Sequence, residues 1–457
     1  MRFTSTRGGD AATFSEAVIK GLANDGGLFV PETMPDISSY SKQWRGLPYT
    51  ELAYSFLSLF ATDISDSELR YCIENAYNAF PNPKTPAPLV KLSDNLHVLE
   101  LFHGPTLAFK DFALQLLGQL YGRHIRNTGH SINILGATSG DTGSAAIYGM
   151  LKQPGVHSFI LYPEGRIAEL QERQIACTGS PFVHPFAVHG SFDDAQSIVK
   201  QIFGDAKFSS TYSLTAVNSI NIARILAQCI YYLDTILKLG ADDDNPLEFI
   251  VPTGNFGNVL AGWMLSKMGM QGLRFCVATN VNAVVSDFFR TGEYCPGKVI
   301  PSYAPSMDIQ QASNFERWLW WHFNGDSVRV REVMTTLYRD GKFVLNETLS
   351  GNDIIRTTSC NDDEIKNQIE QIWDEKKYIA DPHTVCAFSA VRKDVRSVVL
   401  ATAHPAKFPE IIASVTGQCP KHTSLEALKH HTVVKQVMSA NIETVKAAIA
   451  DTCLFLI

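Results

Sequence analysis

The sequence has few features of a disulfide-rich, membrane-spanning or nucleic-acid-binding protein. Its nine cysteines form no Cys-x-x-Cys pair and no regular framework, which argues against a disulfide-stapled fold and against a structural zinc site. No stretch is apolar for long enough to cross a bilayer, and the first ten residues lack the apolar run of a signal sequence. A net charge of −7 disfavours general binding to nucleic acids or anionic membranes. We therefore expect a protein of the reducing cytoplasm with no metal, no membrane and no nucleic-acid partner.

Two common nucleotide-binding motifs are also missing. The chain has glycine-rich loops at residues 136–144 and 253–258, each between an apolar run and a helical pattern. Neither loop has the spacing G-x-G-x-x-G or the Lys-Ser/Thr ending of a P-loop, so dinucleotide and triphosphate binding lose support. At such a junction, glycines let the backbone approach a ligand, and N–H groups at the helix start bind an anion. Taken singly, either loop is better explained as an ordinary turn between a strand and a helix.

The chain does contain a regular alternation of strand-like and helical segments. Its 457 residues leave room for about two or three domains, and 45% hydrophobic and 19% charged residues are typical of a globular protein. Residues 1–95 predict a mostly helical unit that ends in a proline-rich stretch. After it, apolar runs at 98–100, 132–135, 159–161 and 249–251 lead into helical patterns at 112–123, 144–152, 166–177 and 258–267. This alternation predicts an α/β fold with parallel strands and helices on both faces.

One lysine has the surroundings that covalent chemistry requires. Lys110 lies between Phe109 and Phe112, at the expected start of a helix over residues 112–121. Apolar neighbours partly desolvate an amine, which lowers its pKa and leaves more neutral amine to attack an aldehyde. A Schiff-base lysine needs these properties. Taken alone, the stretch is also compatible with a solvated lysine at a helix start.

A candidate anion site lies at the start of a long helical pattern further along the chain. Asn221, Arg224 and Gln228 recur at intervals of three and four, on a different side from the apolar residues. Asn218 or Ser219 is the expected N-cap, so that the helix start and the arginine could bind an anion together. A capped helix with the arginine in solvent remains the alternative.

Together these segments resemble the threonine synthases, within the tryptophan-synthase-β class (fold type II) of pyridoxal-phosphate enzymes. The resemblance runs nearly from end to end, with motifs in family order at residues 5–8, 14–17, 21–31, 102–112, 136–144, 216–221, 253–258 and 313–317. It implies two open parallel-sheet lobes with the cofactor between them. An N-terminal domain would span residues 1–95 and a catalytic core residues 96–457. Within the core, a smaller mobile lobe would comprise about 111–217, and a larger lobe about 96–110 and 218–457.

The resemblance also implies how the chain holds its cofactor, pyridoxal 5'-phosphate. Lys110 would be the catalytic residue and form the Schiff base. Asp141 would lie near the cofactor's 3-hydroxyl, a position where many relatives in the wider class carry asparagine. Thr402 would present its hydroxyl to the pyridine nitrogen, although a β-branched residue in a strand needs no such role. The residues expected to cradle the cofactor phosphate are Gly254, Asn255, Phe256, Gly257 and Asn258.

The implied substrate is O-phospho-L-homoserine, which would react with water to give L-threonine and phosphate in the last step of threonine biosynthesis. The residues expected to contact its carboxylate or phosphate are Thr138, Ser139 and Thr142, together with Asn218, Ser219 and Arg224. Because dehydratases and cysteine synthases need no substrate-phosphate site, residues 218–224 disfavour them. Two alternatives remain: a phospholyase acting on another phosphorylated amino compound, and a non-catalytic protein that binds pyridoxal phosphate or a phosphorylated metabolite. The resemblance further implies a monomer or a dimer.

Several other residues have structural explanations. The spacing of Ser313 and Glu316 predicts a capping box, and a similar N-cap is expected at Ser191 and Asp194. His383 lies at an expected helix start rather than in a zinc site. The tryptophans of residues 318–321 are dense enough to anchor a core.

Overall fold

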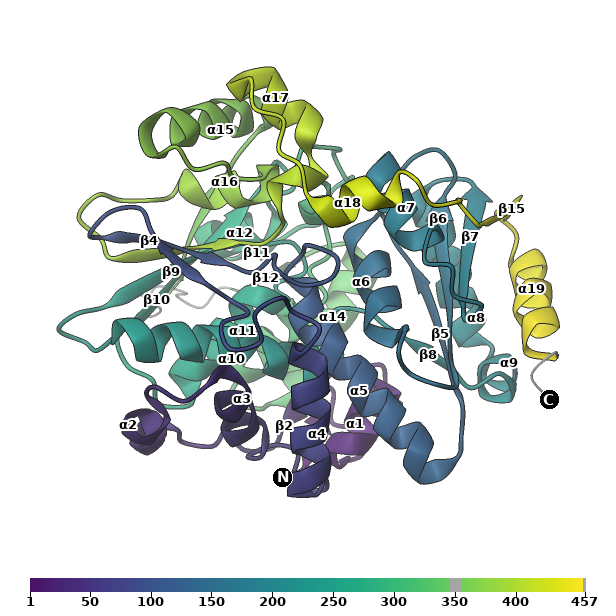
Figure 1. The fold of residues 1–457 in the computed structure, drawn as a ribbon. Coiled ribbons are helices and arrows are strands. Elements are labelled where there is room, and N and C mark those ends of the chain that lie inside the picture. The colour runs from purple at the N-terminus through teal and green to yellow at the C-terminus, as the bar shows by residue number, and fades with distance from the viewer. Residues whose placement is uncertain (346–354, 455–457) are drawn as a thin grey trace.

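The computed structural model describes residues 1–345 and 355–454. Two separate β-sheets lie at the left and the right of Figure 1, and the N-terminal helices lie below them. The six-stranded sheet has the order β13 (Ile355–Ser359), β10 (Leu273–Thr279), β9 (Leu247–Pro252), β14 (Ser397–Ala401), β4 (Leu96–Glu100) and β3 (Leu89–Lys91). The five-stranded sheet has the order β15 (Gln436–Ser439), β7 (Val183–His189), β6 (Val156–Pro163), β5 (Ile132–Ala137) and β8 (Leu214–Ala216).

Strand pairing in both sheets is almost entirely parallel. Only β3 joins antiparallel, at the edge beside β4. Parallel sheets are covered by helices on both faces, so their central strands are apolar throughout. Every residue of β6, β9 and β14 is buried. The alternation predicted from the sequence is confirmed, since each of the four apolar runs forms a strand that leads into a helix.

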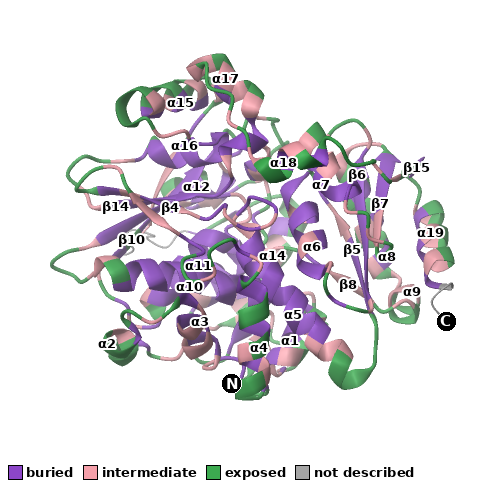
Figure 2. Cartoon of the chain, viewed as in Figure 1, coloured by how far each residue is buried: buried purple, intermediate pink, exposed green. Residues whose placement is uncertain are grey.

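The helices divide between the two sheets. Around the six-stranded sheet lie α10 (Ile222–Leu239), α11 (Gly257–Lys267), α12 (Val284–Thr291), α13 (Phe315–His322), α14 (Ser327–Asp340), α15 (Asp362–Lys376), α16 (Pro382–Phe388) and α17 (Pro409–Thr416), with the short hairpin β11 (Glu293–Tyr294) and β12 (Phe343–Val344). Around the five-stranded sheet lie α6 (Asp141–Met150), α7 (Glu169–Ala176), α8 (Phe192–Gly204), α9 (Ala206–Thr211), α18 (Thr423–Leu428) and α19 (Ile442–Leu454). Figure 2 shows α10 and α11 buried along most of their length.

Helix α5 (Lys110–Thr128) connects the two lobes and packs closely on α6. A Cβ atom on Gly118 would lie 2.0 Å from the carbonyl oxygen of Gly149, so two glycines let the helix backbones touch. Each glycine lies eight residues after the first residue of its helix, Lys110 and Asp141. Eight residues of helix rise by about 12 Å. The two helix starts also lie near each other, since Lys110 Nζ is 3.7 Å from Asp141 Oδ2.

The C-terminal part of the chain returns to the smaller lobe. After α17 it runs through α18 to β15, which pairs parallel with β7, and Figure 1 shows it crossing the top of the molecule in yellow. This differs from the expectation that residues 218–457 form the larger lobe. Strand β15 has only four residues, of which Met438 alone is buried, so it carries no alternating pattern that a sequence could reveal.

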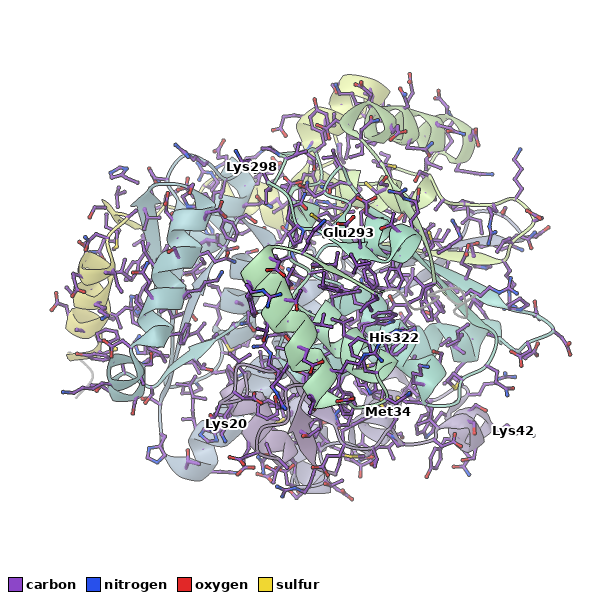
Figure 3. All side chains as sticks on the ribbon, turned by 180° about the vertical axis from the view of Figure 1, so that it is seen from behind. Lys20, Met34, Lys42, Glu293, Lys298 and His322 are labelled. Carbon is purple, nitrogen blue, oxygen red and sulfur yellow. The ribbon has the colours of Figure 1, made fainter. Side chains whose placement is uncertain are left out.

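The N-terminal unit is mostly helical and packs on α5 and α10 from below. It consists of β1 (Phe3–Ser5), α1 (Phe14–Lys20), β2 (Phe29–Pro31), a 3-10 turn η1 (Ser38–Tyr40), α2 (Ser41–Trp44), α3 (Tyr49–Leu57) and α4 (Asp66–Tyr77). Arg7 binds the Glu316 carboxylate through Nε at 2.9 Å and Nη2 at 2.8 Å. Figure 3 shows the back of the molecule, where α14 lies above the N-terminal unit.

The capping box expected at Ser313 is wrong. Helix α13 starts at Phe315 with Asn314 as N-cap, and Glu316 binds Arg7 and the Thr6 hydroxyl instead of capping the helix. The capping box at Ser191 is confirmed, because its hydroxyl accepts from Asp194 N at 3.1 Å at the start of α8. Trp318 is fully buried, which confirms the predicted core anchor.

Two further findings hold for the described residues. No helix in the ranges 1–345 and 355–454 is both long and apolar enough to span a bilayer. In the same part of the chain, no three histidine, cysteine or acidic side chains come together as ligands for a metal ion.

Candidate active site

Lys110 is the first residue of α5 and its amine lies in a polar cluster between the lobes. Its side chain is only 11% exposed, with Nζ 3.7 Å from Asp141 Oδ2 and 3.4 Å from Ser306 Oγ. Burial lowers the pKa of Lys110 to about 8, and the nearby charges of Lys407 and Arg224 lower it further, against the pull of Asp141. The helix runs from 110 to 128, longer than the predicted 112–121, but the lysine does lie at its start.

This lowered pKa predicts a pH profile. Only the neutral amine attacks an aldehyde, so capture of pyridoxal phosphate by the cofactor-free protein should speed up as pH rises and level off above pH 8. The rate of covalent capture, followed by absorbance, is expected to be half-maximal near pH 8 after correction for the same reaction of Nα-acetyl-lysine amide. A midpoint near the ordinary lysine value of about 10.4 would show that the site does not activate Lys110.

Asp141 is the buried anion of the cluster and starts α6. Its Oδ1 accepts from Lys407 Nζ at 2.6 Å and from Gln171 Nε2 at 3.1 Å, and its Oδ2 accepts from Ser306 Oγ at 3.1 Å. Burial alone would favour the neutral acid, but the Lys407 and Lys110 charges hold the pKa of this carboxyl well below its usual range. Asp141 therefore stays ionised at neutral pH.

Ser306 is held in place by His383 and Asp381 at the start of α16. The backbone N–H of Ser306 donates to His383 Nε2 at 3.1 Å, and His383 Nδ1 lies 2.7 Å from Asp381 Oδ1. Because a backbone N–H can only donate, Nε2 accepts and Nδ1 carries the proton. The predicted position of His383 at a helix start is confirmed, and the structure adds its contact with the lysine site.

The glycine loop at residues 253–258 leads into the first N–H groups of α11. The first intrahelical bond runs from Leu260 N to Phe256 O, so the N–H groups of residues 257–259 have no acceptor within the helix. A Cβ atom on Gly254 would lie 2.9 Å from Ile309 Cδ1 and 3.0 Å from Ser306 O. The loop thus lies against Ser306, whose hydroxyl contacts Lys110, and together they can hold an anion-bearing aldehyde.

Gly254 should therefore tolerate no side chain. Gly254→Ala would force its methyl group against Ser306 and Ile309, and such overpacking costs about 1–3 kcal/mol. We expect the affinity for pyridoxal phosphate, measured by fluorescence titration, to fall by about tenfold or more. Gly204→Ala is the matched control, because no atom lies within 4 Å of its Cβ position. Equal affinities for the two variants would place the cofactor phosphate elsewhere.

Arg224 lies in the first turn of α10 and is a buried cation. It is 3% exposed, and its Nε and Nη1 have no hydrogen-bond partner among residues 1–345 and 355–454. Burial lowers the pKa of this guanidinium to about 10. A buried charge without acceptors is costly in a folded protein, so these groups favour an anionic ligand. The alternative that placed the arginine in solvent is wrong.

The expected N-cap of α10 is also wrong. The helix is capped by Asn221, whose Oδ1 accepts from Ala223 N at 3.1 Å and whose Nδ2 donates to Val18 O at 2.8 Å. The N-terminal unit thus selects the cap through a contact distant in sequence. Asn218 is exposed and Ser219 half-buried, ahead of the helix.

Asn314 joins this segment to the glycine loop. Its Nδ2 lies 3.1 Å from Ser219 O and 3.2 Å from Asn255 O. The start of α10 therefore lies beside the start of α11, and Arg224 is close enough to Lys110 to lower its pKa. The structure thus brings the amine, the glycine loop and the arginine into one site between the lobes.

Comparison with known proteins decides the family. Residues 81–401 match the family of pyridoxal-phosphate-dependent enzymes, residues 2–77 the threonine synthase N terminus, and residues 384–449 the threonine synthase C-terminal region. The threonine synthase of Schizosaccharomyces pombe is 41% identical, over 90% of this chain and 88% of its own. The chain belongs to the threonine synthase family. The Saccharomyces cerevisiae relative is 37% identical, over 98% of this chain and 97% of its own.

Solved structures agree with this membership. The crystal structure of the PLP-bound threonine synthase from Brucella melitensis is 37% identical and superposes with a TM-score of 0.94, covering 99% of both chains. The yeast threonine synthase gives a TM-score of 0.92 at 35% identity, covering 99% of both chains. The predicted fold type II architecture is confirmed, and this chain is a pyridoxal-phosphate-dependent lyase. Its own residues fit that cofactor: a buried amine with a lowered pKa, and a glycine loop at the start of a helix.

The remaining residues expected from the threonine synthase resemblance lie around this cluster in different settings. Thr138 is buried, and its hydroxyl accepts from Gly140 N at 3.0 Å and Gly143 N at 2.9 Å, so it shapes the first glycine loop. Ser139 is exposed and lines a cavity of about 460 Å³ that also reaches Gln171. Thr142 is half-buried in the first turn of α6.

Thr402 and Asn258, both expected at the cofactor, lie close to the lysine and to the glycine loop. The carbonyl of Thr402 accepts from Phe109 N at 2.9 Å, next to Lys110, and its side chain is buried. Asn258, in the first turn of α11, is buried, and its Oδ1 accepts from the hydroxyls of Tyr231 at 2.6 Å and Tyr232 at 3.0 Å.

Sequence reasoning missed Lys407, Ser306 and Gln171. Lys407 ends the 3-10 turn η3 (Pro405–Lys407) shortly after β14, and a lysine close behind a buried strand was a usable signal. Ser306 lies in the turn η2 (Pro305–Met307), where its sequence neighbours carry no motif. Gln171 is one of several polar residues in α7, so nothing in the sequence distinguished it as a partner of Asp141.

Proposed function

We propose that this chain converts O-phospho-L-homoserine and water into L-threonine and phosphate. The observation that carries the proposal is the buried guanidinium of Arg224, which lacks acceptors among the described residues and lies within electrostatic reach of Lys110. The glycine loop accounts for one phosphate, that of the cofactor. A second anion site next to the amine favours a substrate with a phosphate of its own.

Lys110 is the proposed catalytic residue. Pyridoxal phosphate supplies, when bound, the electron sink that stabilises negative charge at the substrate Cα. Lys110 would take the Cα proton and then move protons at the neighbouring carbons, and a pKa of about 8 suits both uptake and release near neutral pH. Arg224 and the Ser219 hydroxyl would stabilise the phosphate as it leaves the γ-carbon.

The other site residues would bind and orient. The backbone of residues 254–258 would cradle the cofactor phosphate, Asp141 would face its 3-hydroxyl, and Thr402 its pyridine nitrogen. A neutral hydroxyl at that nitrogen does not enforce a protonated ring, which moderates the electron sink. Thr138, Ser139 and Thr142 would hold the substrate carboxylate or phosphate from the smaller lobe, with Asn218 facing them.

The organisation into a domain of residues 1–95 and a core of 96–457 belongs to the same proposal. A smaller lobe of about 111–217, completed by the returning strand β15, would close over the substrate and exclude water until it is needed. The resemblance also supports a monomer or a dimer that acts in the cytoplasm, and sedimentation of the purified protein tests the oligomeric state.

A coupled assay tests the reaction. Phosphate release from O-phospho-L-homoserine is followed together with the amino-acid product. Equal amounts of phosphate and threonine support the proposal. Phosphate accompanied by a keto acid would instead favour a phospholyase, and no phosphate release from a protein loaded with cofactor would favour a binding role.

A further inference from the structure

Lys407 is a second lysine in the cluster, and it is completely buried. Its side chain is 0% exposed, with Nζ 2.6 Å from Asp141 Oδ1 and 2.9 Å from Thr106 O. Lysine is almost never fully buried unless it is paired. Its partner is the ionised Asp141 carboxylate, so the two groups form a buried ion pair.

The Asp141 carboxylate therefore lies between two lysines, with one amine at each oxygen. Lys407 contacts Oδ1 at 2.6 Å, whereas Lys110 approaches Oδ2 only to 3.7 Å. The closer cation satisfies the carboxylate. The Lys407 ammonium and the Asp141 carboxylate together carry almost no net charge. Their combined field at Lys110 therefore does little to stabilise the protonated form of its amine.

We propose that Lys407 is a positioning residue: it orients Asp141 and neutralises its charge, which leaves Lys110 as the exchangeable amine instead of one half of a buried ion pair. The proposal rests on the proposed function only for the role of Lys110 as the amine that takes the cofactor. A buried carboxylate beside a single lysine would form a salt bridge with that lysine. Neither group would then be free to react with a ligand.

The position of Lys407 in the fold supports this role. Asp141 starts α6 in the smaller lobe, whereas Lys407 follows β14 of the larger lobe. Thr106, the other partner of Lys407, lies in the segment that leads to Lys110, and its hydroxyl donates to the buried Asp111 at 2.7 Å. One ammonium group thus connects both lobes with the segment that carries Lys110.

The other charged groups around the pair do not replace Lys407. Arg224 also lowers the pKa of Lys110, whereas the Asp141 carboxylate is bound by Lys407, Gln171 and Ser306. His383 faces Asp141 and has its Nδ1 proton directed to Asp381. Burial raises the pKa of Asp111 to about 6.

The test is the pH dependence of cofactor capture by the full-length, cofactor-free chain. The capture rate is again corrected for the rate of the same reaction with Nα-acetyl-lysine amide. Lys407→Met removes the charge and keeps the length of the side chain. We expect its midpoint to lie about one pH unit above that of the unaltered protein, because Asp141 then holds the proton on Lys110. Lys435→Met is the matched control, since Lys435 pairs with Glu172 at 2.7 Å outside the site, and its midpoint should not move. An unshifted midpoint in folded Lys407→Met protein overturns the proposal.

A second pair of variants covers the case in which Lys407→Met does not fold. Asp141→Asn removes the carboxylate, and Asp141→Asn/Lys407→Met removes both charges. The double variant should titrate about one unit above Asp141→Asn, because a positive charge has left the surroundings of Lys110. Equal midpoints for these two variants would overturn the proposal. Capture needs no substrate, so an enzyme that shows the shift but forms no threonine would refute the proposed reaction and leave the role of Lys407 intact.

Discussion

Lys110→Ala should abolish the turnover of O-phospho-L-homoserine. The amine would be lost both as the attachment point of the cofactor and as the base at Cα, and we expect kcat to fall by at least about 10³-fold. The exchange places no new group in the site, and Asp141 keeps its contacts with Lys407, Gln171 and Ser306 and loses only its 3.7 Å ion pair with Lys110. Phosphate release with saturating cofactor and substrate measures the effect.

An exposed lysine provides the control for this variant. Lys267 ends α11 and is exposed, so Lys267→Ala should keep nearly full activity. Both variants should show the circular-dichroism spectrum of the unaltered protein. Turnover by folded Lys110→Ala within about tenfold of the unaltered enzyme would remove Lys110 from the chemistry.

Arg224→Met should weaken catalysis while leaving the fold as stable as before, or more stable. Loss of a buried charge-assisted contact with the substrate phosphate is worth about 3–4 kcal/mol, so kcat/KM should fall by roughly 100- to 1000-fold. In phosphate-free buffer the same guanidinium is a buried cation, and in the described part of the chain nothing accepts from its Nε and Nη1. Replacing it by an apolar side chain should raise the free energy of unfolding by about 1–3 kcal/mol, or leave it unchanged.

Two further measurements separate a binding role of Arg224 from a structural one. Inorganic phosphate should raise the Tm of the unaltered protein and have a smaller effect on Arg224→Met. Arg290→Met is the control, because that arginine is exposed and pairs with Asp287 at 2.8 Å on the surface. An Arg224→Met protein that is clearly less stable but fully active would show that the guanidinium supports the fold and binds no substrate.

The parts of the fold that the sequence predicts are those encoded locally. Each long apolar run forms a strand, and each helical pattern that follows it forms a helix. A strand buried on both faces of a parallel sheet is apolar at every position, and this pattern is visible within a few residues of sequence. Lys110 and the loop at 253–258 were found in the same way. Their function depends on a helix start, which is a local feature.

The parts that sequence analysis could not predict depend on distant partners. Asn221 becomes the N-cap of α10 through its contact with Val18, and Glu316 leaves its expected capping box to bind Arg7. Both choices follow from how the N-terminal unit docks. Likewise, nothing near Lys407 in the sequence shows that its ammonium meets Asp141, 266 residues earlier in the chain. Only the packing of the two lobes brings them together.

Borohydride reduction of the cofactor-loaded protein tests the central claim most directly. Reduction fixes the cofactor to the lysine that carries it, and peptide mass mapping then locates the label. We expect a single pyridoxyl group on the peptide that contains Lys110, and none on Lys407, the other lysine at Asp141. A label on Lys407, or a reduced protein that carries no label, would contradict the account.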